Sequence, residues 1–216
     1  ITGHLKIMDK YDPDHRVGLI VDEWGCWHNV EPDTNPGFLY QQNTMRDALV
    51  ASLTLDIFNK NCTRVVMANL AQTVNVLQAV ILTEGGRMAL TPTYHVFDLY
   101  KAHQDAALIA HEAQATAVGV GMTTVPDISL TASKKDNVLT VTVSHTALDK
   151  PADIRLLPGV KAAAVTGRVL TGRMNAYNDF ENQPVAIQPM TGITAAADGI
   201  RCTLPPCSVS ELTLAL

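Results

Sequence analysis

The sequence predicts an α/β unit followed by an all-β unit, and three patterns along the chain indicate this order. Two short apolar runs, 17–21 and 65–71, have the composition of strands that are buried in a parallel sheet. Between them, residues 42–60 repeat apolar side chains at the spacing of an amphipathic helix. After about residue 110, Val, Thr, Ile and Leu alternate with turn residues, which is typical of antiparallel strands.

The first unit has the order strand, helix, strand, helix. The first helix carries an apolar face made of Met45, Leu49, Leu53 and Ile57, and a second helix is expected near 94–105. This order predicts a βαβα unit, in which the two strands lie parallel and the crossover between them is right-handed. The carboxyl ends of both strands should then lie at one edge of the sheet.

The second unit has the pattern of an antiparallel β-sandwich. Residues 138–144 alternate apolar and hydroxyl side chains, which predicts one buried face and one face in contact with water. We place the domain boundary between 1–106 and 107–216, with an Ala- and Gly-rich linker over 107–121. The expected strands are 127–133, 138–144, 153–157, 162–171, 184–188, 193–203 and 207–215.

Composition excludes several classes of function. The net charge is −5 and no run of Lys and Arg occurs, so no nucleic-acid partner is expected. No apolar stretch approaches the roughly 20 residues of a membrane helix. The seven histidines and four cysteines form no HExxH or CxxC motif, so no metal or cofactor is expected. The chain starts ITGHLK, without Met or a secretion signal, which predicts a cut chain in the cytoplasm.

The segment DEWGCWH follows the first apolar run and suggests chemistry on sugars. Glu23 follows one predicted strand and Gln72 follows the next, so both side chains should reach the same crevice. Because side chains alternate along a strand, only one of Asp22 and Glu23 should face it. Glycosidases use carboxyl pairs, and both tryptophans, Trp24 and Trp27, lie within four residues of Glu23. An acid at such a position also commonly serves as an ion-pair partner or a helix cap, and the spacing alone leaves these roles open.

Four long blocks identify a family. GLIVDEWGCWHNVEP, NPGFLYQQNTMRDALVASLTLDIFNK, VVMANLAQTVNVLQAVI and TPTYHVFDLYKAHQ closely resemble glycoside hydrolase family 51, the α-L-arabinofuranosidases, and RVLTGRMNAYNDFEN resembles it more loosely. The resemblance implies a (β/α)₈ TIM barrel followed by a β-sandwich. Residues 1–106 would be its C-terminal fragment, with barrel strands 7 and 8, and 107–216 the sandwich. The implied activity is retaining release of terminal α-L-arabinofuranosyl residues from arabinan and arabinoxylan, by a homo-oligomer, typically a hexamer.

The same resemblance assigns the site residues. Glu23 matches the family's nucleophile, Gln72 a glutamine that contacts the sugar, and Trp27 an aromatic residue of the same pocket. The family's acid/base glutamate stands in an Asn–Glu pair upstream, and no such pair occurs here. The chain is therefore expected to need the N-terminal part of the same enzyme and to be inactive alone. The alternative is a non-catalytic β-sandwich module that serves assembly or carbohydrate binding.

Overall fold

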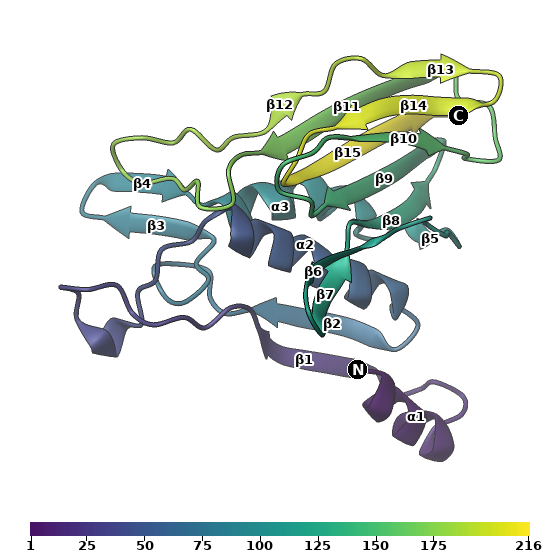
Figure 1. Cartoon of the computed structure of the whole chain (residues 1–216). Helices are drawn as coiled ribbons and strands as arrows, with labels where there is room; N and C mark the ends of the chain where they lie inside the picture. The colour runs from purple at the N-terminus through teal and green to yellow at the C-terminus, as the bar shows by residue number, and fades with distance from the viewer.

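The computed structural model describes residues 1–216, and its elements stack in layers (Figure 1). The first layer is a parallel pair, β1 (Leu19–Trp24) and β2 (Val65–Leu70). The second holds α2 (Met45–Lys60) and α3 (Pro92–Tyr100), and the two sheets of a β-sandwich follow. A further helix, α1 (Thr2–Tyr11), precedes β1. No helix is both long and apolar enough to span a bilayer.

The predicted βαβα order is confirmed. β1 and β2 pair in parallel, with Leu19 opposite Val65 and Trp24 opposite Leu70, and α2 connects them. The connection from β2 to α3 carries a hairpin that the sequence analysis does not predict, β3 (Ile81–Glu84) and β4 (Arg87–Leu90). The short 3₁₀ helices η1 (Pro36–Phe38) and η2 (Lys101–His103) lie before α2 and after α3.

The predicted sandwich is also present, as a six-stranded sheet facing a three-stranded one. Their apolar faces share a core, in which Leu139, Val141 and Val143 of one sheet pack with Ile200 and Leu204 of the other. The six-stranded sheet has the order β12 (Gln188–Pro189), β11 (Ala164–Thr171), β15 (Ser208–Ala215), β9 (Val138–His145), β8 (Ile128–Lys135), β5 (Ala107–Leu108). The other has the order β10 (Ala152–Leu156), β14 (Gly199–Leu204), β13 (Thr194–Ala196).

Three segments of the sandwich differ from the prediction. The expected strand 193–203 is divided into β13 and β14 by a turn. The expected strand 184–188 is reduced to β12, because Val185 instead pairs its backbone with the side chain of Asn178. A hairpin begins within the expected linker and extends past it, with strands β6 (Ala117–Val120) and β7 (Thr123–Pro126), and its turn uses Gly121 at a φ of 61°.

The hydroxyl side chains of 138–144 do not contact water, contrary to the prediction for this strand. Thr142 and Ser144 are fully buried, because α2 and α3 cover this face of the six-stranded sheet. Polar groups of the helices pair with it: Ser144 Oγ donates to Ser52 Oγ at 2.8 Å. The buried side of α2 therefore includes polar residues, whereas Ile57, predicted on its apolar face, is 51% exposed.

Asp56 of α2 is a buried carboxyl group in this interface. Its carboxylate accepts hydrogen bonds from Tyr100, Ser129 and Thr131, at 2.8, 2.5 and 2.7 Å. Burial raises the pKa of Asp56, although the three hydroxyl donors act in the opposite direction. Both oxygens of the buried carboxylate therefore have hydrogen-bond partners within the protein.

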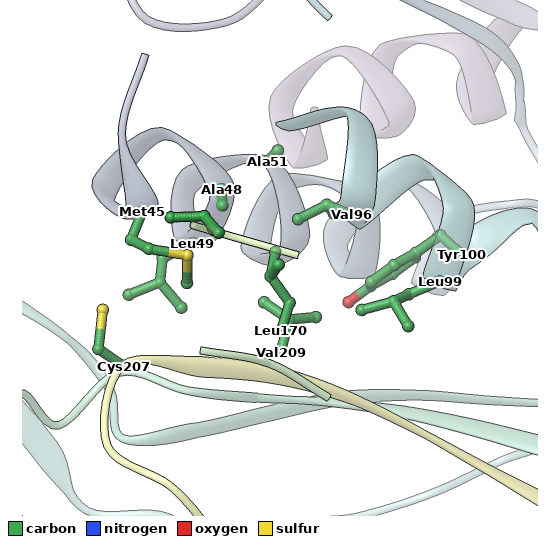
Figure 2. Close-up of a cluster of buried hydrophobic side chains, with 11 residues drawn as sticks. Met45, Ala48, Leu49, Ala51, Val96, Leu99, Tyr100, Leu170, Cys207 and Val209 are labelled. Carbon is green, nitrogen blue, oxygen red and sulfur yellow. The ribbon is translucent and has the colours of Figure 1, made fainter. Parts of the chain in front are cut away.

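The largest apolar cluster joins the two predicted domains (Figure 2). Met45 and Leu49 of α2 and Leu99 of α3 pack against Leu170 of β11 and Val209 of β15. The first turn of α2 is also capped by the sandwich, because the amides of Met45 and Arg46 donate to carbonyl groups of the β11–β12 connection. The helices are therefore held between the parallel pair and the sandwich.

Candidate active site

The carboxyl end of β1 is irregular at the two acidic residues. Val21 lies opposite Ala68 and Trp24 opposite Leu70, so Asp22 and Glu23 together face the single residue between those partners. Two residues opposite one is a β-bulge, a feature that re-aims side chains and is common beside active sites. Both carboxylates are exposed. The strict alternation on which the expectation about these two carboxylates rests is interrupted at this point.

Trp24 belongs to the core. Its ring packs against Phe58 of α2 edge-to-face, with centroids 5.4 Å apart, and against Phe97 of α3 in a stacked arrangement at 6.2 Å. This large ring anchors the end of β1 to the helix layer. Trp24 therefore offers no face to a ligand at the open side of the sheet, whereas Trp27 is 71% exposed.

Gly25 turns the chain immediately after β1. Its φ is 142°, in a region that side chains disfavour, and a Cβ there would lie 3.2 Å from Oε1 of Gln78. Glycine at this position lets the backbone approach Gln78 closely. The amide of Cys26 uses this approach, because it donates to that same Oε1 at 2.8 Å.

Two buried glutamines fasten the loop after β1. Gln78 also donates to the carbonyl of Asp47 at 2.8 Å, which ties the loop to α2. Gln41 accepts from the amide of His28 at 2.8 Å and donates to the carbonyl of Cys26 at 3.1 Å. Both glutamines are almost inaccessible to solvent. The backbone of the loop is thus fixed by side chains from two other segments.

Asp47, in the first turn of α2, connects this loop to the helix. It completes a capping box by accepting the amide of Thr44 at 2.8 Å. It also contacts Arg46 at 3.0 Å and Nε2 of His28 at 3.3 Å. The thiol of Cys26 lies close by, and burial, followed by the negative charge of Asp47, raises its pKa to about 12.

The structure brings two of the three predicted site residues to one edge. The amide of Ala71 donates to the carbonyl of Trp24 at 3.0 Å, so the chain reaches Gln72 directly beside the end of β1. Glu23 and Gln72 are both exposed there. Trp27 lies on the loop after β1, three residues beyond Trp24. The peptide bond between Ala71 and Gln72 is cis.

Sequence reasoning missed the residues that support this edge. The capping pattern of Thr44 and Asp47 before an apolar helix is a recognisable signal and would have identified Asp47. No local pattern marks Gln41 or Gln78, because their partners lie 13 to 52 residues away along the chain. Such contacts become visible only once the fold is known.

The hollows of the sandwich lie away from this edge. One, of about 660 Å³, opens between β8, β9 and β10, and another, of about 850 Å³, lies beside the turn between β13 and β14. Neither is lined by Trp, Tyr or Phe, the side chains that stack on sugar rings.

Comparison with known proteins decides the family. The family model described as the α-L-arabinofuranosidase C-terminal domain matches residues 22–208. The chain belongs to this family. An intracellular exo-α-L-arabinofuranosidase of Bacteroides ovatus is 47% identical over 193 residues, which are 88% of this chain and 37% of that protein. An exo-α-(1→6)-L-arabinofuranosidase of Bifidobacterium longum is 31% identical, over 90% of this chain and 41% of that protein.

A solved structure extends the likeness to the fold. The family 51 arabinofuranosidase of Xanthomonas axonopodis pv. citri matches with a TM-score of 0.95 and 45% identity, over 99% of this chain and 44% of that one. The resemblance to glycoside hydrolase family 51 is thereby confirmed. This arabinofuranosidase C-terminal domain chain spans less than half the length of the relatives that it matches.

Proposed function

We propose that this chain is the C-terminal part of a retaining α-L-arabinofuranosidase in which Glu23 is the nucleophile. The observation that carries the proposal is the place of Glu23: it is exposed, at a bulge, at the carboxyl end of β1 and beside the end of β2. Catalytic groups of β/α barrels occupy this end of the strands. The family of the chain supplies the substrate class, a terminal arabinofuranosyl group of arabinan- or arabinoxylan-type glycans.

We further propose that β1 and β2 are the last two strands of a (β/α)₈ barrel, within residues 1–106, and that 107–216 form the sandwich domain. Three apolar side chains on this pair support the first idea: Ile20, Val66 and Met67 are 49%, 66% and 51% exposed. Strand edges and apolar faces of this kind are normally covered by further strands. The covering strands would come from the N-terminal part of the same enzyme.

The proposed chemistry needs two carboxyl groups, which a retaining glycosidase holds about 5–5.5 Å apart. Glu23 attacks the anomeric carbon, the bond to the departing oxygen breaks, and the partner acid gives that oxygen its proton. Water, activated by the same partner, then releases arabinose from Glu23. General acid–base catalysis contributes about 10²–10⁴-fold. Because we place the partner outside this chain, the chain alone should hydrolyse nothing.

Gln72 and Trp27 would bind the sugar. An amide both donates and accepts hydrogen bonds, so Gln72 suits vicinal hydroxyl groups. The exposed indole of Trp27 suits an apolar sugar face. By family resemblance we also expect a homo-oligomer, a hexamer, in solution.

The test is an aryl α-L-arabinofuranoside assay on the chain combined with the N-terminal part of its enzyme. Glu23→Ala should abolish turnover, and azide should restore it while yielding an arabinosyl azide of inverted configuration. Asp22→Asn is the matched control, because it alters the neighbouring exposed carboxylate, and azide should not raise its activity. Full activity of Glu23→Ala, or equal azide rescue of both variants, would refute the assignment.

A further inference from the structure

Three side chains that could bind a metal ion converge beside the loop after β1. Sγ of Cys26, Nε2 of His28 and a carboxylate oxygen of Asp47 all lie within 4.8 Å of one another. We propose that this cluster binds a thiophilic divalent metal ion of the zinc class. The cluster uses neither Glu23 nor Gln72, and Trp27 of the proposed sugar site lies between two of its ligands, Cys26 and His28.

The spacing of the nitrogen and oxygen ligand atoms suits tetrahedral coordination. Metal–nitrogen and metal–oxygen bonds of about 2.0–2.2 Å at tetrahedral angles place the two ligand atoms roughly 3.3–3.6 Å apart. Nε2 of His28 and Oδ1 of Asp47 are already 3.3 Å apart. The imidazole is 39% exposed, so water can reach a fourth position. Three protein ligands and one water complete a common zinc coordination shell.

The ligands are held in place before any metal binds. The backbone of Cys26 and His28 is fixed by Gln41 and Gln78, which are buried. Asp47 is fully buried in the first turn of α2. Little conformational freedom therefore remains to be lost on binding, which favours affinity.

One oxygen of Asp47 is free enough to coordinate. Oδ2 is engaged by the amide of Thr44 at 2.8 Å and by Arg46 at 3.0 Å. Oδ1 has longer contacts, 3.3 Å from His28 and 3.3 Å from Arg46. A metal at Oδ1 would replace the first of these and repel the guanidinium of Arg46. Arg46 therefore opposes metal binding. Its replacement should raise the affinity for the metal, whereas replacement of a ligand should lower it.

The donor set selects the kind of metal. Thiolate and imidazole favour zinc-like ions, whereas Ca²⁺ and Mg²⁺ require shells made mainly of oxygen. The thiol is protonated without metal, since burial raises the pKa of Cys26 to about 12, so the ion must displace one proton. Sequence motifs gave no sign of the site, because Asp47 stands 19 residues beyond His28.

Cobalt(II) is a suitable probe, because a thiolate bound to it gives a near-ultraviolet charge-transfer band and tetrahedral coordination gives visible bands. Titration of the purified full chain with Co²⁺ should give both, saturating at one equivalent, and Zn²⁺ should remove them. Cys26→Ser should abolish the charge-transfer band. Cys62→Ser is the matched control, because Cys62 is an exposed thiol outside the cluster, and should change nothing.

Two further variants test the remaining contacts. His28→Asn should weaken Co²⁺ binding at least tenfold, whereas Arg46→Gln should strengthen it severalfold. A missing charge-transfer band, a band that survives Cys26→Ser, or equal losses with Cys26→Ser and Cys62→Ser would each overturn the proposal. The last result would indicate indiscriminate binding by thiols. None of these measurements uses hydrolysis, so their failure would leave the proposed function standing.

Discussion

His103 shows at the scale of one residue how the helix layer is joined to the sandwich. Its Nδ1 lies 2.7 Å from the hydroxyl of Ser133 and its Nε2 lies 2.9 Å from that of Thr142, both on the six-stranded sheet. Its ring also packs edge-on against Tyr100. Burial, followed by the charge of His111, lowers the pKa of His103 to about 4. The imidazole is therefore neutral in the folded protein at neutral pH.

This depressed pKa predicts that acid weakens the interface. The unfolded chain binds a proton at His103 below about pH 6.5, whereas the folded chain does so only near pH 4. The stability that neutral His103 provides is present above pH 6.5 and is lost as the pH falls from 6.5 to 4. The shift corresponds to roughly 3 kcal/mol at most. The midpoint of urea unfolding should fall as the pH is lowered from 7 to 4.5, and this fall should be smaller in His103→Gln. His4→Gln is the control, because it changes a histidine on the exposed helix α1, and it should leave the fall unchanged.

At the scale of the element, the regular periods of the sequence predicted the right structures. The runs at 17–21 and 65–71 and the helix pattern at 42–60 correspond to β1, β2 and α2. What they could not predict is which faces are buried. A helix placed between two sheets buries polar residues as well, so Asp56 is hidden while Ile57 is exposed. That outcome depends on the hydroxyl groups of β8 and β9, which follow some 70 residues later.

The loop after β1 also shows that local sequence patterns do not predict contacts between distant segments. The sequence pointed to Glu23 and Gln72, because strand ends can be located from apolar runs. It could not reveal that Gln41 and Gln78 hold the backbone of the loop after β1, because side-chain contacts between residues far apart along the chain produce no periodic pattern in the sequence. The positions of the proposed catalytic residues were predictable; the residues that support them were not.

Gln78 permits a direct test of this support. Gln78→Met keeps the volume of the side chain but leaves the amide of Cys26 without its partner, and it removes the donor to the carbonyl of Asp47 and the hydroxyl of Thr93. An unsatisfied buried group costs about 1–3 kcal/mol, so the free energy of unfolding should fall by roughly 1–3 kcal/mol. Amide hydrogen exchange at Cys26 and His28 should accelerate as well. Gln42→Met is the control, because the Gln42 side chain has only a marginal contact, at 3.5 Å.

An unchanged free energy of unfolding in Gln78→Met, or an equal decrease in Gln78→Met and Gln42→Met, would show that the loop after β1 does not depend on the hydrogen bonds of Gln78. Faster exchange confined to the loop, with no change in the rest of the protein, would locate the effect there. The comparison therefore separates a local support from a general loss of packing.

At the scale of the whole molecule, the two sequence-predicted domains differ in whether they have a hydrophobic core of their own. The sandwich has a core entirely of its own, formed by residues such as Val141, Leu204 and Leu212. The core of the first 106 residues is instead shared, because α2 and α3 pack against Leu170 and Val209 (Figure 2). Two carbonyl groups of the sandwich also accept from amides in the first turn of α2. The first unit therefore depends on the second more than the second depends on the first.

Separate expression of the two units tests this dependence. Residues 107–216 should fold alone, with cooperative thermal unfolding, because their core is complete. Residues 1–106 should not, because removal of the sandwich exposes one side of the largest apolar cluster and takes away carbonyl acceptors from two amides of α2. Trp24 and Trp27 both lie in residues 1–106, so their near-ultraviolet circular dichroism reports on that unit alone. A native tryptophan signal from isolated 1–106 would contradict the shared core. A signal that is absent from isolated 1–106 and returns when 107–216 is added would demonstrate the shared core.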